Sequence, residues 1–422
     1  MILREIAAFA VCLTAIADAR CQVTGQAKTP RQDPAPQTIG KGDIARAVDE
    51  YLAANPPVQR GRPWERILAD IQFYGDLRLR HETDTQRVGR RDRHRQRMRL
   101  RLGFDHYIND ELTLGARIVT GDPADPNSPH VSFGDAFNRE SLALDRAYLR
   151  YQPQAISGLS ITAGKFNDPF ARNPVYGELV WDADVQPEGL FATYNLQSQK
   201  AIENFAVTAG VYPVLEYNTD SETFISVVEA RGRVRFSDRL VSDMSIGYHL
   251  YSGATPAGRS VLLDDNAGNE TIDRNGDVIA DAFASHFGIL HPIATLTYDA
   301  GGAKLLTVAA EYMRNLRAED GADQGYAIGI SYGNMRRQGD WWGYYQWQVV
   351  EREAVFSAFA QDDFLLATNH RSHIFGVNYQ LLDTTGLHLY ALASAPDEAS
   401  AGPLTNRDHY QWRFRIDLNV RF

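Results

Sequence analysis

The chain has 422 residues, of which 44% are hydrophobic and 11% aromatic, and its formal net charge is −10. This length allows two or three globular domains or one large barrel. Beyond the first 19 residues no apolar run approaches the roughly 18 residues of a membrane helix, so the sequence excludes a helical membrane protein. Only one of the 2 cysteines lies beyond residue 19, so this part of the chain cannot form an internal disulfide.

The first segment, Met1 to Ala19, predicts a secretory signal peptide. Arg4 precedes an apolar stretch at 6–16, and residues 17–19 form a small-x-small cleavage site. Cleavage after Ala19 also removes Cys12. Lipoprotein processing at Cys21 is the weaker alternative, because the preceding arginine fits that cleavage poorly.

Residues 20–63 predict a periplasmic extension. A tether at 22–40 is rich in Pro, Gln and Thr. A short helix at 44–55 follows, which Asp43 can cap and Pro56-Pro57 ends. We expect a lead-in that packs at the barrel mouth, with a plug or an oligomerising helix as alternatives.

Residues 64–422 predict one all-β domain, an antiparallel transmembrane barrel of about 16 strands. Connections such as 108–109 and 237–238 are short, whereas 122–140 and 253–282 are long. Short periplasmic turns that alternate with long external loops are typical of outer-membrane barrels. The predicted strands are 71–83, 91–107, 110–121, 141–153, 158–167, 188–198, 203–214, 222–236, 239–252, 283–299, 303–318, 323–335, 340–352, 368–382, 386–396 and 408–422.

The sharpest local pattern is an arginine at every second residue from Arg91 to Arg101. Alternate residues of a strand share one face, and a charge on the lipid side at mid-depth costs roughly 2–4 kcal/mol, so these arginines should face water inside the barrel. Inward acids on the first, second and last strands are few: Asp76, Glu82 and Asp417. The predicted pore-lining basic wall consists of Arg78, Arg80, Arg97, Arg99, Arg101, Arg117, Arg146, Arg150, Arg413 and Arg415.

Three interpretations of this basic wall differ in function. In a soluble protein it would be a nucleic-acid-binding patch, which the signal peptide and the strand alternation argue against. In a barrel, the arginines either pair with acids from an infolded loop or form a conduit that attracts anions. Arginine suits both roles, because its guanidinium binds carboxylate and phosphate groups with two parallel hydrogen bonds.

Two loops have patterns that could bind or select ions. The segment 168–187 could fold inward as a constriction with acids at Asp168, Glu178, Asp182 and Asp184, and an ordinary surface loop is the alternative. Residues 273–277 are similar to a calcium loop, but Gly at the sixth position and Glu at the twelfth are absent. We therefore expect an exposed turn there and no metal site.

The last strand, Tyr410 to Phe422, alternates apolar and polar residues without a miss. Such a strand meets lipid on one face and water on the other, and a closed barrel is the only sheet with no unpaired edge in hydrocarbon. A soluble β-sandwich is the alternative. The segment resembles the terminal strand of bacterial outer-membrane barrels, which implies that Phe422 is an assembly signal for the barrel-assembly machinery.

Four segments resemble the Gram-negative "putative porin" family: 73–80, 145–151, 164–170 and 179–189. They read Phe73-Tyr-Gly-Asp-Leu-Arg-Leu-Arg80, Asp145-Arg-Ala-Tyr-Leu-Arg-Tyr151, Gly164-Lys-Phe-Asn-Asp-Pro-Phe170 and Leu179-Val-Trp-Asp-Ala-Asp-Val-Gln-Pro-Glu-Gly189. The resemblance runs from about residue 64 to the end and implies a passive outer-membrane pore. It implies no catalytic residues.

The sequence thus predicts a porin for small hydrophilic solutes, with a bias toward anions. An export barrel for acidic polysaccharides and a non-conducting structural or adhesin barrel are the alternatives. No catalytic motif is present, so we expect no enzyme activity and no cofactor. Expected partners are outer-membrane lipid, lipopolysaccharide, the assembly machinery, small anions and further copies in a homotrimer, but no nucleic acid.

Overall fold

A computed structural model describes residues 70–87, 89–196, 202–216, 222–253, 261–273, 276–302, 304–364, 366–397 and 409–422. The predicted signal peptide (1–19) and the periplasmic extension (20–63) lie outside the described residues. No helix among the described residues is long and apolar enough to cross a membrane.

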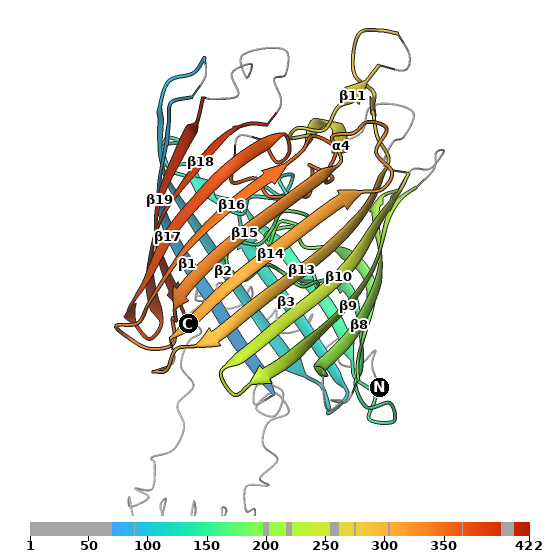
Figure 1. Ribbon diagram of the computed structural model, residues 1–422, viewed down its shortest axis with the longest axis vertical. Helices are drawn as coiled ribbons and strands as arrows, with labels where there is room; N and C mark the ends of the chain where they lie inside the picture. Colours follow the sequence, from blue (N-terminus) through green and yellow to red (C-terminus); the bar gives the residue numbers. More distant parts are fainter. Residues whose placement is uncertain are drawn as a thin grey trace, which may run out of the picture. The chain divides into compact units, whose positions relative to one another are not determined.

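The described residues form one closed antiparallel β-barrel (Figure 1). Its sheet has 17 strands, of which the two-residue β4 (Val131–Ser132) is a short addition to the wall. The wall strands are β1 (Ile71–Thr85), β2 (Arg93–Tyr107), β3 (Leu112–Thr120), β5 (Leu142–Tyr151), β6 (Leu159–Lys165), β7 (Glu188–Asn195), β8 (Ile202–Leu215), β9 (Thr223–Ser237), β10 (Leu240–Ser252), β13 (Phe287–Asp299), β14 (Leu305–Asn315), β15 (Gln324–Gly333), β16 (Trp341–Val350), β17 (His370–Leu382), β18 (Thr385–Pro396) and β19 (Gln411–Arg421).

The 16-strand prediction is confirmed, and each predicted strand overlaps one wall strand. The largest difference is the start of β13 at Phe287 rather than at residue 283, because β12 (Ala282–Phe283) pairs instead with β11 (Thr271–Ile272). These two short strands and α4 (Val261–Asp264) belong to the connection between β10 and β13. Figure 1 shows the long connections at the upper end, here called the loop end, and the C-terminus at the opposite turn end.

Pairing of β1 with β19 closes the barrel. The pairs run from Asp76↔Arg421 to Thr85↔Trp412, so the last strand lies beside the first along most of its length. At the turn end the Gly75 and Phe422 backbones exchange two hydrogen bonds, with N···O distances of 2.8 and 3.1 Å. A Cβ on Gly75 would lie 2.5 Å from the Phe422 ring. Only glycine leaves room for the terminal ring at this seam.

The outer face of the wall is an apolar belt. Large hydrophobic side chains are exposed on consecutive strands, as expected for residues that contact lipid. Examples are Leu79, Leu102, Ile118, Leu144, Leu190, Val211, Val228, Ile246, Leu296, Ile328, Phe375 and Ile416. In a water-soluble protein an exposed apolar surface of this extent would be a site of aggregation.

We expect deletion of Phe422 to impair assembly, because it removes a ring packed over Gly75 and two seam hydrogen bonds, each worth about 0.5–1.5 kcal/mol. The deletion variant should accumulate as protease-sensitive periplasmic protein, which fractionation and proteolysis would measure. Phe422→Tyr, which keeps the ring and the backbone, is the control. Normal membrane levels of the deletion variant would contradict a role for Phe422 in insertion.

Candidate functional site

The inner faces of β19, β1 and β2 carry a dense array of charges, which we call the arginine wall. Its arginines are Arg78, Arg80, Arg93, Arg95, Arg97, Arg99, Arg101, Arg413, Arg415 and Arg421. The strand register places these residues in rows across the three strands. Carboxylates occupy the centre of three rows, at Asp76, Glu82 and Asp84, and a fourth lies on β19 at Asp417. Arginines therefore outnumber carboxylates on these strands.

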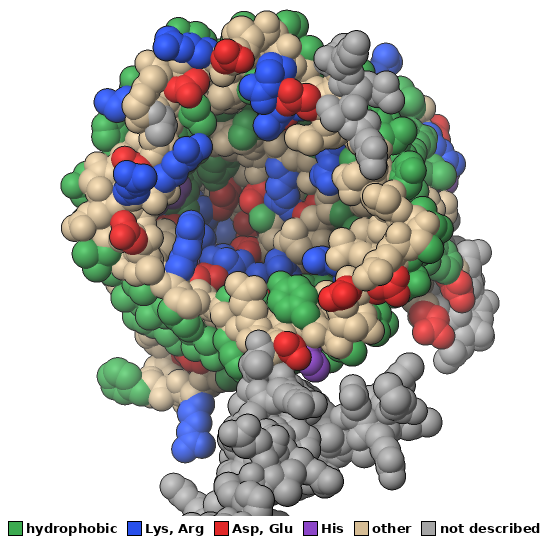
Figure 2. All heavy atoms as spheres, turned by 90° about the horizontal axis from the view of Figure 1, so that it is seen from below, with side chains coloured by type: hydrophobic (Ala, Val, Ile, Leu, Met, Phe, Trp, Pro, Cys, Tyr) green, Lys and Arg blue, Asp and Glu red, His purple; other side chains and the backbone are tan. Residues whose placement is uncertain are grey.

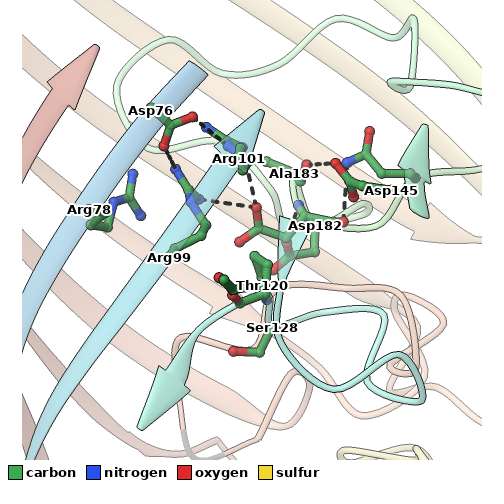
Figure 3. Close-up of polar contacts among 12 residues, drawn as sticks. Asp76, Arg78, Arg99, Arg101, Thr120, Ser128, Asp145, Asp182 and Ala183 are labelled. Carbon is green, nitrogen blue, oxygen red and sulfur yellow. Dashed lines mark hydrogen bonds and ion pairs between the residues drawn. The ribbon is translucent and has the colours of Figure 1, made fainter. Parts of the chain in front are cut away.

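Toward the turn end, one carboxylate on β1 and one on a loop hold two arginines (Figure 3). Asp76 accepts hydrogen bonds from Arg99 Nη2 at 3.0 Å and from Arg101 Nε at 2.6 Å. Asp184 reaches the same pair from the connection between β6 and β7, at 3.3 Å from Arg99 Nη1 and 3.9 Å from Arg101 Nη1. The segment predicted as a constriction thus contacts the arginine wall.

In the middle of the wall, Asp417 binds Arg80 with two parallel hydrogen bonds of 2.8 Å. Arg78 donates to Asn419 at 2.7 Å and lies 3.7 Å from the Asp417 carboxylate. Arg80 and Arg99 are 7% and 3% exposed, whereas the Arg78 and Arg101 side chains are 25% and 22% exposed. The last two are therefore the charges that a solute at this level can approach.

Near the loop end, acids from β1 and from a second loop pair with β19. Arg415 Nε donates to Glu82 at 2.6 Å, and its Nη1 binds Asp363 in the connection between β16 and β17. Arg413 Nε donates to Asp84 at 2.6 Å. Glu82 also pairs with Arg95 on β2. Because Glu82 is fully buried, these arginines compensate a carboxylate that would otherwise be costly to bury.

Three arginines of the wall, Arg93, Arg97 and Arg421, have no carboxylate within 4 Å among the described residues. Arg97 Nη2 donates to Ser128 Oγ at 2.9 Å and to the His130 carbonyl at 3.2 Å, while its buried Nε has no partner. Arg93 is exposed and lines a cavity of about 280 Å³ at the loop end, as do Arg97 and Ser128. The wall therefore carries uncompensated positive charge at this level.

The basic surface continues onto β3 and β5. Arg117 pairs with Asp145, whereas Arg146 donates to Gln186 at 2.7 Å and to Asn167 at 2.6 Å. Arg150 lies 5.3 Å from the centre of the Tyr148 ring. All arginines of the sequence-based list thus lie on a contiguous part of the barrel, β19-β1-β2-β3-β5, and Figure 2 shows basic and acidic side chains lining the hollow at the turn end.

The connection 166–187 lies inside the barrel rather than on its surface. It contacts two separate parts of the wall: Ala171 N donates to Glu229 on β9 at 2.9 Å, and Asn173 donates to Gln346 on β16 at 3.1 Å. Asp168 is buried and pairs with Arg172 in the same segment. Of the four acids predicted for a constriction, Asp184 is the one that reaches the arginine wall.

A second connection, 351–369, fills the barrel beside the first. Its Val355, Phe356 and Ala358 are completely buried and belong to a hydrophobic cluster with Trp181 and residues of β8 to β15, including Ile225. Asp182 N donates to the Phe359 carbonyl at 2.8 Å, so the two connections are joined. This cluster occupies the side of the barrel opposite the arginine wall, because β8 to β14 lie across the ring from β19, β1 and β2.

Two acids of these connections, Glu178 and Asp362, have raised pKa values. Burial raises the pKa of Glu178 to about 8. Arg172 lowers this pKa, whereas the neighbouring carboxylates Asp363 and Asp184 raise it further. Burial and Asp363 raise the pKa of Asp362 to about 7. Glu178 also has a φ of 148°, a conformation that side chains other than glycine rarely adopt. Such strain is often found at functional sites.

The sequence-based prediction leaves out two acids that pair with arginines of the wall, Asp84 and Asp363. The first predicted strand ends at residue 83 and so excludes Asp84, whereas β1 extends to Thr85. The predicted strands leave 353–367 as an external loop, but Asp363 of this segment contacts Arg415 inside the barrel. The second error has a physical cause: loop packing depends on contacts between distant segments, which periodicity does not report. An Ala/Phe-rich run at 354–360 was the available signal.

The described residues contain no group of three or more His, Cys, Asp and Glu that could hold a metal. In the segment once compared with a calcium loop, Asp273 accepts hydrogen bonds from Gly276 N and Val278 N, both at 2.7 Å. These bonds are those of a turn.

Comparisons with known proteins agree with this architecture. The family model described as "Putative porin" matches residues 82–250 and 290–422. The chain is similar to OprB of Pseudomonas putida (high-pH structure), with a TM-score of 0.57 and 14% identity over 86% of this chain and 97% of OprB. It is also similar to an anion-selective porin from Comamonas acidovorans, with a TM-score of 0.51 and 9% identity over 83% of this chain and 99% of that porin.

No protein with a curated function matches the sequence. At identities this low, the similarity to solved structures shows the fold alone. The family match, in contrast, covers well over half of the chain, from the end of β1 to the last residue. The chain therefore belongs to the "putative porin" family of outer-membrane β-barrel channels.

Proposed function

We propose that this porin is a passive channel for small hydrophilic solutes that favours anions. The observation that carries the proposal is the asymmetry of the barrel interior. One side is filled by the hydrophobic cluster of the connections 166–187 and 351–369, and the other side is the arginine wall. A solute that crosses the barrel therefore passes close to the arginines.

Electrostatics support a bias toward anions. Fixed charges in water are screened over about 8 Å at physiological salt, so only charges near the path affect a permeating ion. Low-dielectric walls concentrate the field of those charges inside a narrow passage. Arg78, Arg93, Arg97 and Arg101 remain partly or fully exposed there, whereas the net charge of −10 belongs to the whole chain.

Two of the expected partners, membrane lipid and the assembly machinery, are consistent with features of the barrel wall. Its apolar outer belt suits contact with membrane lipid, and insertion by the assembly machinery would use the terminal strand. Contact with lipopolysaccharide and a homotrimeric state stay predictions from the sequence. A barrel that carries no ion current in a planar bilayer would favour the structural or adhesin alternative.

We expect the double variant Arg78→Gln and Arg101→Gln to lower the anion-to-cation permeability ratio by about fivefold, because one unit charge 4 Å away is worth about 1 kcal/mol even in water. Neither change leaves a carboxylate unpaired, since Arg80 still binds Asp417 and Arg99 still binds Asp76. The reversal potential in a salt gradient measures the ratio.

The matched control removes two arginines at a turn of the rim. Arg336 and Arg337 are exposed, and replacing both with Gln should change the ratio far less. A wild-type pore that prefers cations at low salt would overturn the proposal, because it would mean that the acids of the two connections outweigh the arginine wall.

We also expect the anion preference to fall as the pH rises from about 6 to about 9. Glu178 and Asp362 have raised pKa values of about 8 and about 7, so they are mostly neutral at the lower pH and ionised at the higher pH. Ionisation adds negative charge beside Arg172 and Arg415, while the arginines stay charged.

Reversal potentials across this pH range test the expectation. Replacing Glu178 with Gln and Asp362 with Asn should flatten the dependence and leave the low-pH value nearly unchanged. An anion preference that rises with pH in the wild-type channel would contradict the assigned direction.

A further inference from the structure

We propose that the cavity at the loop end is a binding site for a multivalent oxyanion, such as phosphate or a small polycarboxylate. The inference rests on the proposed anion channel and adds a defined site to it. The cavity measures about 280 Å³ and is lined by arginines from two strands and one connection. These are Arg87, Arg93, Arg95, Arg97, Arg413 and Arg415.

Four carboxylates, Asp84, Asp125, Asp362 and Asp363, line the cavity against six arginines. Asp125 accepts hydrogen bonds from the backbone N–H groups of Asn127 and Ser128, both at 3.1 Å. Asp84 binds Arg413 Nε at 2.6 Å, and Asp363 binds Arg415 and the Tyr176 hydroxyl. Positive charge therefore remains on the arginines that have no acid of their own. Among the described residues these include Arg93 and Arg97, which lie at inward positions of the same strand on either side of Arg95.

The geometry of Arg97 favours a defined binding site for an anion rather than long-range electrostatic attraction alone. Ser128 Oγ and the His130 carbonyl accept hydrogen bonds from Nη2, which fixes the guanidinium at the edge of the cavity. Its Nε is buried and has no acceptor, and the same holds for Arg95 Nε. A buried donor without an acceptor costs stability. A bound oxyanion in the cavity would supply negative charge and acceptor oxygens close to these groups.

The charge pattern also distinguishes the class of ligand. Inward residues of one strand recur every second position, so Arg93, Arg95 and Arg97 present three guanidinium groups along about 13 Å of β2. A monovalent ion such as chloride can meet one of them closely. An anion with several oxygens can accept hydrogen bonds from two or more, and arginine binds such groups in a bidentate manner.

The loop-end position gives the site a role in uptake. The hydrophobic cluster narrows the barrel on the opposite side, so a solute entering from the loop end meets this cavity beside the arginine wall. An anion held in the cavity has a raised local concentration at the loop-end side of Arg78 and Arg101. The channel would then saturate with its preferred anion, unlike a pore that sorts ions only by charge.

The test measures binding and selectivity separately. Inorganic phosphate or citrate is added on the loop side of single channels carrying chloride current, and binding to the purified barrel in detergent is followed by titration calorimetry. We expect saturable block and measurable heat with phosphate or citrate. The double variant Arg93→Gln and Arg97→Gln should weaken binding about tenfold or more, since each lost bond to a charged group approaches a factor of ten.

Neither of these two arginines pairs with an acid among the described residues, so the double variant leaves no carboxylate uncompensated there. Arg93→Gln alone, at an exposed position, serves if the double variant folds poorly, and it should weaken binding by a smaller factor. The Arg336→Gln and Arg337→Gln variant should bind as the wild type does.

The outcomes separate the site from the channel proposal. An anion-selective wild-type pore with neither saturable block nor heat would overturn the site and leave the proposed function standing. Binding that persists unchanged in the Arg93 and Arg97 variants would also overturn it. A cation-selective pore that still binds phosphate through Arg93 and Arg97 would overturn the proposed function and keep the site. Comparing the affinities for phosphate and citrate shows whether the cavity prefers a phosphate or a polycarboxylate.

Discussion

Every backbone amide and carbonyl group of a strand in hydrocarbon must find a partner within the sheet, and this requirement forces the barrel to close. Closure is made by β1 and β19, which are more than 300 residues apart in the sequence. The same pairing creates the arginine wall, because it brings Asp417 beside Arg80 and Glu82 beside Arg415. The site therefore depends on the seam: a shift of its register by one residue would turn these charges toward lipid.

The hydrophobic cluster inside the barrel determines where the charges act. Leu179, Val180 and Trp181 are at most 6% exposed, and they anchor the segment whose next residues include Asp184. Apolar burial of about 25 cal/mol per Å² favours this packing, and salt does not screen it as it screens charges. The acid is thus held against Arg99 by contacts made on the far side of the barrel. The result is a passage bounded by one charged wall and one apolar filling, rather than a uniformly lined pore.

Much of the fold was readable from the sequence, but less of the site was. A period of two residues identifies strands and their inward faces, so the arginines of the wall could be named together with the 16 strands. Periodicity does not give the register between distant strands, so the acid opposite each arginine could not be predicted. It also says nothing about irregular segments. The burial of 351–369 and the position of Asp363 therefore became visible only in three dimensions.

Arginines that lie directly opposite each other on β1 and β2 are evidence about the function of the arginine wall. Arg78 lies opposite Arg99, and Arg80 lies opposite Arg97, and like charges at directly opposed positions destabilise a sheet. Asp417, Asp76 and Asp184 compensate Arg78, Arg80 and Arg99, but only a hydroxyl and a carbonyl compensate Arg97. On the β19 side Arg80 already lies opposite Asp417. Ion pairs that served stability alone would also place an acid or a neutral residue on the β2 side, at the position of Arg97. An arginine at position 97 therefore costs folding energy, and an anion in the passage, as the proposed function requires, would offset that cost.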